Sequence, residues 1–324
     1  MKCFADPLRT QRILYTALIF LLAIIPLFLK NPYILHVLIM LFLFAYLGGV
    51  WNILSGYTGQ FSLGHAAYFG IGSYVSTLLF IHWGITPWLG MLIGAVVSLV
   101  VGIFIGFLCF RYGIRGVSFV LITLCFSEIV RLIVINLKVF GGSNGIIIPL
   151  KGDSFWNLQF TSKIPYYYII LSMMVLLILL TYKLEKSRMG DFFIAVREDE
   201  DASEALGINT MRYKLISMGV SCFAMALGGT FYAQYTSYIQ PDLNLGIPLS
   251  VEIIFAPIVG GIGTILGPLL GSSILIIFSE ISRVTMGQFR GMHLMIYGVF
   301  IIFVMLYMPH GILRSLEKLF RKVS

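Results

Sequence analysis

One acid–base pair lies inside a strongly apolar stretch of the sequence, at Glu128 and Arg131. Residues three apart on a helix share a face, so these two side chains can form an ion pair. Charged groups inside a membrane are costly unless they are paired. A carboxylate that relays protons must be free to titrate, whereas a neighbouring arginine keeps it charged. The spacing therefore favours a structural intramembrane pair, Glu128 with Arg131, over a direct role in transport.

Half of the carboxylates, seven of fourteen, belong to one polar segment, residues 183–214. The acidic run 198–201 suits the start of a helix, because negative charge there complements the helix dipole. Ala205 and Leu206 then share one apolar face with Ala202, and a glycine typically ends a helix, as Gly207 would here. A helix this short is marginal in water. We therefore expect it to pack either on this protein's own spans or on another protein.

Residue patterns for covalent catalysis are missing from the sequence. There is no Ser/His/Asp, HExxH or paired-carboxylate constellation at a credible membrane surface. No lysine follows a glycine anywhere, so the GxxxxGK[ST] phosphate loop is missing too. We expect no catalytic residue, no metal site and no bound cofactor, and an enzyme is the least favoured class. Energy for transport would come from a partner or from an ion gradient.

The elements that must position these residues are apolar helices. The chain is 59% hydrophobic and 11% charged, with a mean hydropathy of +0.95, whereas soluble domains are about 25% charged. A helix needs about 20 apolar residues to cross a bilayer. The predicted fold is an all-α polytopic transmembrane bundle of about ten crossings with interrupted helices: 13–29, 33–54, 62–81, 88–110, 116–137, 165–182, 215–239, 249–259, 264–282 and 292–308.

Basic residues orient this predicted bundle. The segments on the side of the termini hold fifteen Lys and Arg residues and those on the opposite side hold six. The positive-inside rule then places both termini and the segment 183–214 in the cytoplasm and the segment 138–164 outside. The chain is predicted to be a single membrane domain, 1–324. Its net charge of +8 fits this topology and an attraction to membrane lipid, and it requires no nucleic acid.

Two glycine-rich segments interrupt the apolar pattern, at 52–74 and at 260–268. Non-helical backbone survives at membrane depth only inside protein or beside a wet cavity. Interrupted helices in the two halves of a transporter point to a midplane transport site. An equally favoured alternative is close helix packing through small residues. The substrate-pathway residues expected on the first interpretation are Asn52, Gly59, Gln60, Ser62, Gly64, His65, Gly260, Gly261 and Gly263.

Four segments carry a family resemblance: GQFSLGHAAYFGIGSYVS at 59–76, GGSNG at 141–145, AVREDEDASEALGIN at 195–209 and GGIGTILGPLLG at 260–271. Together they resemble the LivM type of branched-chain amino acid ABC importer permease. The resemblance implies a multi-pass subunit of a bacterial inner (plasma) membrane importer. Its implied partners are a second related permease, two cytoplasmic ATPase subunits and a periplasmic solute-binding protein.

The resemblance also implies a role for the polar segment 183–214. In such permeases a cytoplasmic loop carries an EAA-type motif that docks on the ATPase, and Glu204, Ala205 and Gly207 match it here, although the pattern is shorter. The coupling residues expected are Asp199, Asp201, Ala202, Glu204, Ala205, Leu206 and Gly207. The implied function is inward transport of Leu, Ile and Val by alternating access, with urea or short amides as other solutes. The alternative is a self-sufficient secondary transporter or channel driven by an ion gradient.

Overall fold

The computed structural model of the chain describes residues 22, 25, 26, 31–286, 292–308, 311–313 and 315. Apart from three residues, the first predicted span, 13–29, lies outside these residues, and so do both chain ends. The number of crossings and the side of the termini therefore stay predictions.

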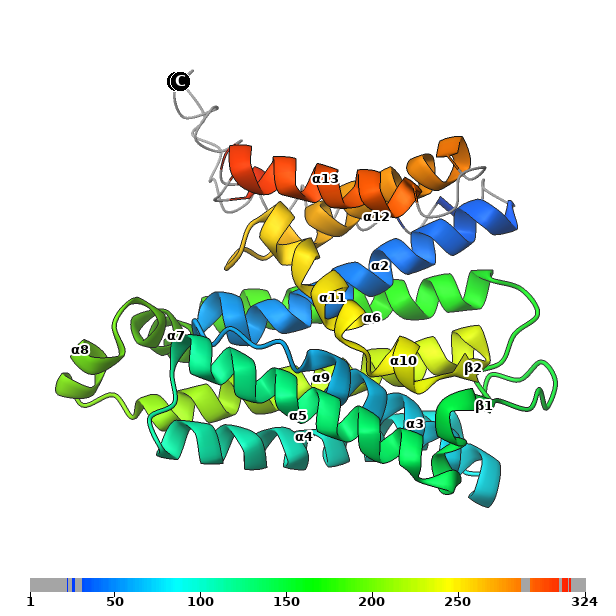
Figure 1. Cartoon of the computed structure of the whole chain (residues 1–324), viewed down its shortest axis with the longest axis horizontal. Helices are drawn as coiled ribbons and strands as arrows, with labels where there is room; N and C mark the ends of the chain where they lie inside the picture. Colours follow the sequence, from blue (N-terminus) through cyan, green and yellow to red (C-terminus); the bar gives the residue numbers. More distant parts are fainter. Residues whose placement is uncertain are drawn as a thin grey trace, which may run out of the picture.

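The described chain is a bundle of apolar helices (Figure 1). Seven of its helical stretches are long and apolar enough to cross a membrane, which confirms the all-α polytopic fold. The nine predicted spans from 33 to 308 coincide with helices to within a few residues. These helices are α2 (Pro32–Asn52), α3 (His65–Trp83), α4 (Pro87–Arg111), α5 (Gly116–Asn136), α6 (Ile164–Glu185), α9 (Thr210–Thr236), α11 (Ile247–Gly260), α12 (Gly267–Met286) and α13 (Met292–Tyr307).

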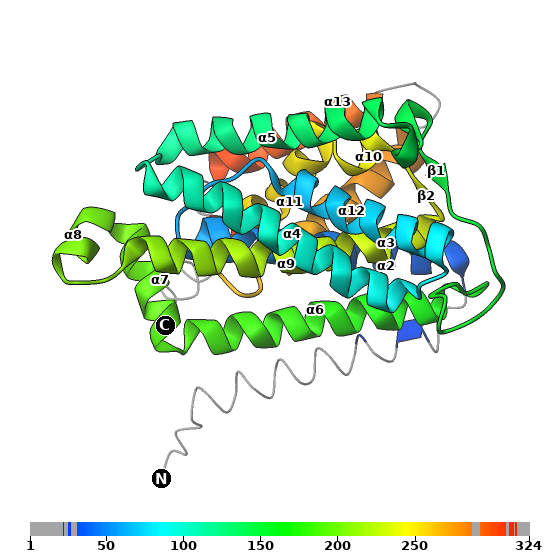
Figure 2. The ribbon, with the colours of Figure 1, turned by 90° about the horizontal axis from the view of Figure 1, so that it is seen from below.

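The short elements gather at the two ends of the bundle (Figures 1 and 2). At one end, called here the α8 end, lie α7 (Arg188–Glu198) and α8 (Glu200–Ala205). At the other, called the strand end, β1 (Ile146–Ile147) pairs antiparallel with β2 (Tyr238–Ile239). The same end holds the single turns η2 (Lys138–Phe140) and η3 (Gly142–Asn144) and the short helix α10 (Pro241–Asn244). The two long polar segments of the sequence thus project from opposite ends.

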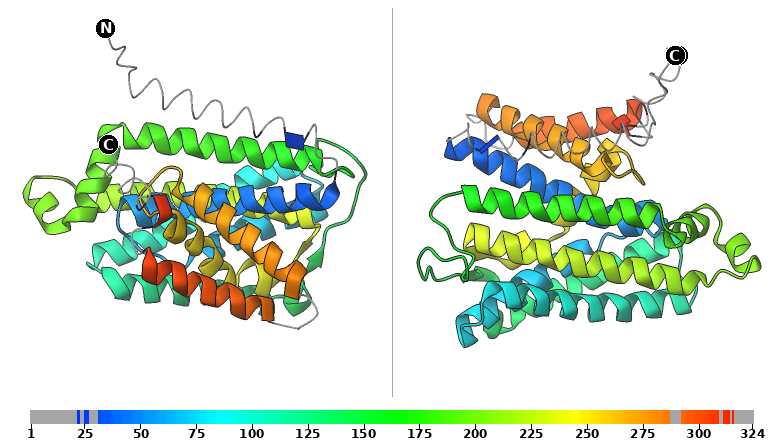
Figure 3. Two further views of the ribbon diagram at one scale, coloured as in Figure 1. Left: turned by 90° about the horizontal axis from the view of Figure 1, so that it is seen from above. Right: turned by 180° about the vertical axis from the view of Figure 1, so that it is seen from behind.

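Glycines set how closely the helices approach one another. A Cβ on Gly72 of α3 would lie 2.1 Å from the carbonyl oxygen of Ala226 on α9, and one on Gly229 would lie 1.9 Å from the carbonyl oxygen of Phe69. No side chain fits at such distances, so backbone packs on backbone where α3 meets α9. On the other side of the bundle α12 packs against α2 and α11, and α13 lies along α12 (Figure 3).

Gly271→Ala is expected to force α12 away from α11. The added Cβ would lie 1.8 Å from the carbonyl oxygen of Ala256 on α11, and overpacking of this kind costs about 1–3 kcal/mol. The apparent melting temperature of the purified protein should therefore fall. Gly298→Ala on α13 is the matched control, because nothing lies within 4 Å of its Cβ position. Equal melting temperatures for the two variants would contradict the packing described here.

Candidate translocation and coupling sites

The first glycine-rich segment breaks the path of the chain inside the bundle. Helix α2 continues as a π-helical turn, η1 (Ile53–Tyr57), and α3 begins only at His65, so 58–64 is not helical. Its polar groups are satisfied locally: the Trp51 indole donates to the carbonyl of Ser62 at 2.8 Å, and the Ser55 hydroxyl donates to the carbonyl of Gln60 at 2.9 Å. These contacts replace helical hydrogen bonds, which non-helical backbone requires if it lies at membrane depth.

His65 and Gly64, two predicted pathway residues, are fully enclosed. The Nε2 atom of His65 lies 2.9 Å from the hydroxyl of Ser221 on α9, and that hydroxyl donates to the carbonyl of Val50 at 2.9 Å. A Cβ on Gly64 would lie 2.5 Å from the carbonyl oxygen of Thr123 on α5. Both residues hold neighbouring helices together in this conformation, whereas the buried Ser62 hydroxyl accepts from the backbone N–H of Gly64 at 3.2 Å.

Asn52 joins the two glycine-rich breaks. Its side-chain carbonyl accepts from the backbone N–H of Gly263 at 2.8 Å, and its side-chain NH₂ donates to the carbonyl of Thr264 at 2.9 Å. A Cβ on Gly56 would lie 1.9 Å from the same side-chain oxygen, so only glycine leaves room for this amide. One buried side chain at the end of α2 thus pairs with the non-helical segment between α11 and α12.

Arg197 connects α7 to the first break. Its guanidinium donates to the carbonyl of Gly56 at 2.9 Å. Gly59, with a φ of +73°, lies against the same side chain, because a Cβ there would be 2.9 Å from the Cγ of Arg197. The sequence analysis missed Arg197, since nothing in its spacing shows that it reaches a carbonyl 141 residues away.

The other predicted pathway residues also lie at the two breaks. Gln60 is buried, and its NH₂ group points back to the carbonyl of Thr58 at 3.4 Å. Gly260 is buried against Gly267, whose carbonyl oxygen would lie 1.7 Å from a Cβ, and Gly261 has a φ of +135°. The predicted residues therefore form one connected region rather than two separate sites.

Glu128 and Arg131 form the ion pair that their spacing predicts. The Nε atom of Arg131 lies 3.0 Å from both carboxylate oxygens of Glu128. The sequence analysis missed a third member: Nη1 of Arg131 donates to Asp242 of α10 at 2.5 Å. One arginine thus links α5 to α10, which supports a structural interpretation of the pair.

Ion pairs fasten α8 to the bundle. Glu200 pairs with Lys214 on α9, whose side chain is only 2% exposed, and with the Nε atom of Arg115 at 3.2 Å. The guanidinium of Arg115 also donates to Asp201 at 2.7 Å, and this hydrogen bond raises the pKa of Arg115 above its ordinary value. The acidic residues at the start of α8 therefore form ion pairs with Lys214 on α9 and with Arg115, which lies just before α5.

Glu200→Gln should destabilise the protein far more than Asp201→Asn. The first change leaves the buried Lys214 ammonium without its carboxylate, which costs about 3–5 kcal/mol for a buried pair. Asp201 is mostly exposed, and losing an exposed pair costs about 0–1 kcal/mol. Thermal unfolding of the two purified variants measures the difference. Similar melting temperatures would show that Glu200 does not stabilise α8.

The apolar face of α8 packs on nothing in the described chain. Asp199 caps the helix by accepting from the backbone N–H of Ala202 at 3.0 Å, and Gly207 ends it with a φ of +84°. Leu206 is 82% exposed. The remaining predicted coupling residues on this surface are also exposed: Asp201, Ala202, Glu204 and Ala205. These residues are therefore accessible to a surface from outside the described chain.

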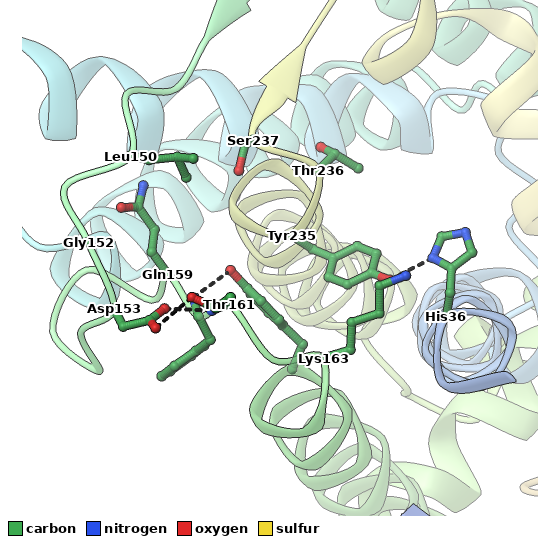
Figure 4. A pocket seen from close by; sticks show the side chains of 12 residues that line it. His36, Leu150, Gly152, Asp153, Gln159, Thr161, Lys163, Tyr235, Thr236 and Ser237 are labelled. Atoms are coloured by element: carbon green, nitrogen blue, oxygen red, sulfur yellow. Dashed lines mark hydrogen bonds between the residues drawn. The ribbon is translucent and has the colours of Figure 1, made fainter. Parts of the chain in front are cut away.

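A cavity of 640 Å³ opens at the strand end between α2, α6, α9 and the segment 150–163 (Figure 4). Its polar groups bind one another: Asp153 accepts from the backbone N–H and the hydroxyl of Thr161 at 2.5 and 2.6 Å, and the Nδ1 atom of His36 lies 2.6 Å from the hydroxyl of Tyr235. The first pair closes the segment 150–163 on itself, and the second joins α2 to α9.

Comparison with known proteins agrees with this architecture. The family described as branched-chain amino acid transport system / permease component matches residues 33–305. The chain is 25% identical to the high-affinity branched-chain amino acid transport system permease protein LivM of Salmonella typhimurium, over 85% of this chain and 68% of the relative. It is 26% identical to LivM of Escherichia coli K12, over 81% of this chain and 65% of the relative.

A second type of relative is the permease protein LivH of Escherichia coli K12, which is 27% identical over 81% of this chain and 88% of its own length. The chain thus covers about two thirds of the length of the LivM relatives and more of LivH. No solved structure matches the chain significantly.

Proposed function

Because this chain belongs to the family of branched-chain amino acid transport system permease components, we propose that it is the translocation subunit of an ATP-binding-cassette importer. It moves leucine, isoleucine and valine inward across the bacterial inner membrane by alternating access. The chain performs no covalent step, and its partners hydrolyse the ATP. The broken helices inside an apolar bundle support this role, since transport sites are built where helices are interrupted.

The partners follow from the two kinds of relatives and from the ends of the bundle. The chain is similar to both LivM and LivH, which supports pairing with a second, related permease. Two ATPase subunits would dock at the α8 end, in the cytoplasm, and a solute-binding protein would dock at the strand end, outside. The excess of lysine and arginine predicted on the α8 side supports this orientation.

Two sets of contacts would carry a movement of α8 into the bundle. Glu200 connects α8 to Lys214 of α9 and to Arg115. Arg197 connects the adjoining α7 to the carbonyl of Gly56, beside the amide of Asn52. A rigid-body push on α8 would therefore shift α9 and both breaks together, which is how packed helices convert a small displacement into a change of state.

One observation carries the proposal: an apolar face of α8, led by Leu206, is exposed although the helix is fixed to the bundle. We expect proteoliposomes that contain the chain with its second permease and ATPase subunits to accumulate radiolabelled leucine when ATP is inside and loaded binding protein is outside. A non-hydrolysable ATP analogue is the control. Equal accumulation with the analogue would refute the ATP-driven mechanism.

The rival function is a secondary transporter driven by an ion gradient, which needs a carboxylate free to titrate in the path. Glu128 is held by Arg131 and is unsuited to this task. Glu252 on α11 is exposed and would be the residue such a transporter uses. Reconstituting the chain alone with a proton or sodium gradient decides between the two, since uptake without ATPase subunits would establish the rival.

A further inference from the structure

Glu252 differs from the other glutamates in the membrane-spanning helices of the described structure. Glu128 pairs with Arg131, and Glu280 pairs with Arg283. Glu252 makes no ion pair or hydrogen bond with any residue that the structure describes, and yet it lies within α11. A lone carboxylate in hydrocarbon is costly, so its exposure favours contact with water or a ligand.

The neighbours of Glu252 place it beside the first break. Two residues earlier on α11, the hydroxyl of Ser250 accepts from the backbone N–H of Ala66 at 3.2 Å, at the start of α3. Ile253 and Ile254 are buried, whereas Glu252 is exposed. The carboxylate is therefore accessible at the depth where α3 begins inside the bundle.

Aromatic rings lie on the same side as this carboxylate. Tyr232 of α9 is near enough to interact electrostatically with Glu252. The ring of Tyr232 packs against that of Phe69 on α3, with centroids 5.6 Å apart. Glu252 therefore lies near the Tyr232–Phe69 ring pair, and its side chain remains exposed in the described structure.

We propose that Glu252 faces the translocation path and receives the ammonium group of the amino acid in transit; this inference rests on the proposed function. A carboxylate attracts an ammonium group, and the faces of nearby aromatic rings add to that attraction. The rings also offer an apolar surface to a branched side chain. Urea and short neutral amides have no positive charge, so this site selects amino acids over them. A single carboxylate holds the solute only briefly, as passage requires.

Thiol labelling of Glu252→Cys tests the water-filled path. The variant is made in a background in which the native cysteines are replaced by alanine: Cys3, Cys109, Cys125 and Cys222. In the assembled importer we expect a charged, membrane-impermeant methanethiosulfonate to label the new cysteine. Val100→Cys is the control, because Val100 is 59% exposed on the apolar face of α4 and should react only with a lipophilic maleimide. If the cysteine at position 252 is not labelled, because either lipid or a partner chain covers it, the proposal is overturned.

Transport by Glu252→Gln tests the role of the charge. We expect leucine uptake to fall about tenfold, in line with the loss of one charge-assisted hydrogen bond, while ATPase stimulation by loaded binding protein stays within about twofold. Glu252→Asp should restore most of the uptake. Glu280→Gln is the control, since this carboxylate pairs with Arg283 near the strand end, and it should transport normally.

The outcomes separate this inference from the proposed function. Normal leucine uptake by Glu252→Gln would overturn the role of the carboxylate and leave the importer intact. Absence of ATP-dependent uptake by the unmodified complex would refute the proposed function, and the labelling of Glu252→Cys would still show whether the residue meets water.

Discussion

Asn52→Leu is expected to lower leucine uptake by about 50-fold and to destabilise the bundle. The substitution leaves the N–H of Gly263 and the carbonyl of Thr264 without their partner, and each buried unpaired group costs about 1–3 kcal/mol. The non-helical segment between α11 and α12 would then lose its attachment to α2. Uptake by the reconstituted complex and thermal unfolding of the purified chain measure the two effects.

Asn136→Leu is the matched control for this change. Asn136 is exposed at the end of α5 and donates only to the carbonyl of Leu132 in its own helix, at 2.8 Å, so its loss should change uptake by less than about twofold. Asn52→Asp keeps the acceptor for Gly263 but loses the donor to Thr264, and we expect intermediate uptake. If Asn52→Leu transports as well as Asn136→Leu, the two breaks do not work as a connected unit.

Leu206→Asp is expected to reduce ATP-dependent uptake by about 30-fold while leaving the melting temperature of the isolated chain unchanged. Leu206 is 82% exposed, so a charge there disturbs no contact in the described chain. In an ATPase groove the same charge would be desolvated without a partner, which costs several kcal/mol. Copurification of the ATPase subunits and uptake are the two measurements.

Leu150→Asp is the control for this prediction, since Leu150 is 75% exposed at the strand end. It should leave copurification of the ATPase subunits intact. Full retention of the ATPase subunits and of uptake by Leu206→Asp would show that α8 docks elsewhere or not at all.

Much of the fold follows from local patterns in the sequence. Apolar run lengths predict the helices because a span must cover the hydrocarbon layer whatever its neighbours are. Glycine and amide residues predict the breaks because only enclosed backbone can leave the helix at that depth. The acidic run 198–201 and Gly207 predict the ends of α8, because helix ends are set by residues near them in the chain, and Asp199 is found to cap it.

The contacts that give these elements a role depend on packing between distant residues. Asn52 and Gly263 are 211 residues apart, and Arg131 and Asp242 are 111 apart. No local rule reveals which polar group a helix will bring to another. From the sequence, the acidic start of α8 is interpreted only as a complement to the helix dipole. In the structure, Glu200 pairs with the buried Lys214, a contact that local sequence rules do not reveal.

Helix α9 connects the strand pair at one end of the bundle to α8 at the other end. Ile146 pairs with Ile239 just beyond the last turn of α9, while Lys214, in its first turns, holds Glu200. A helix of 27 residues is a stiff rod of about 40 Å. A displacement of this strand pair would therefore be carried along α9 to the ion pair that holds α8.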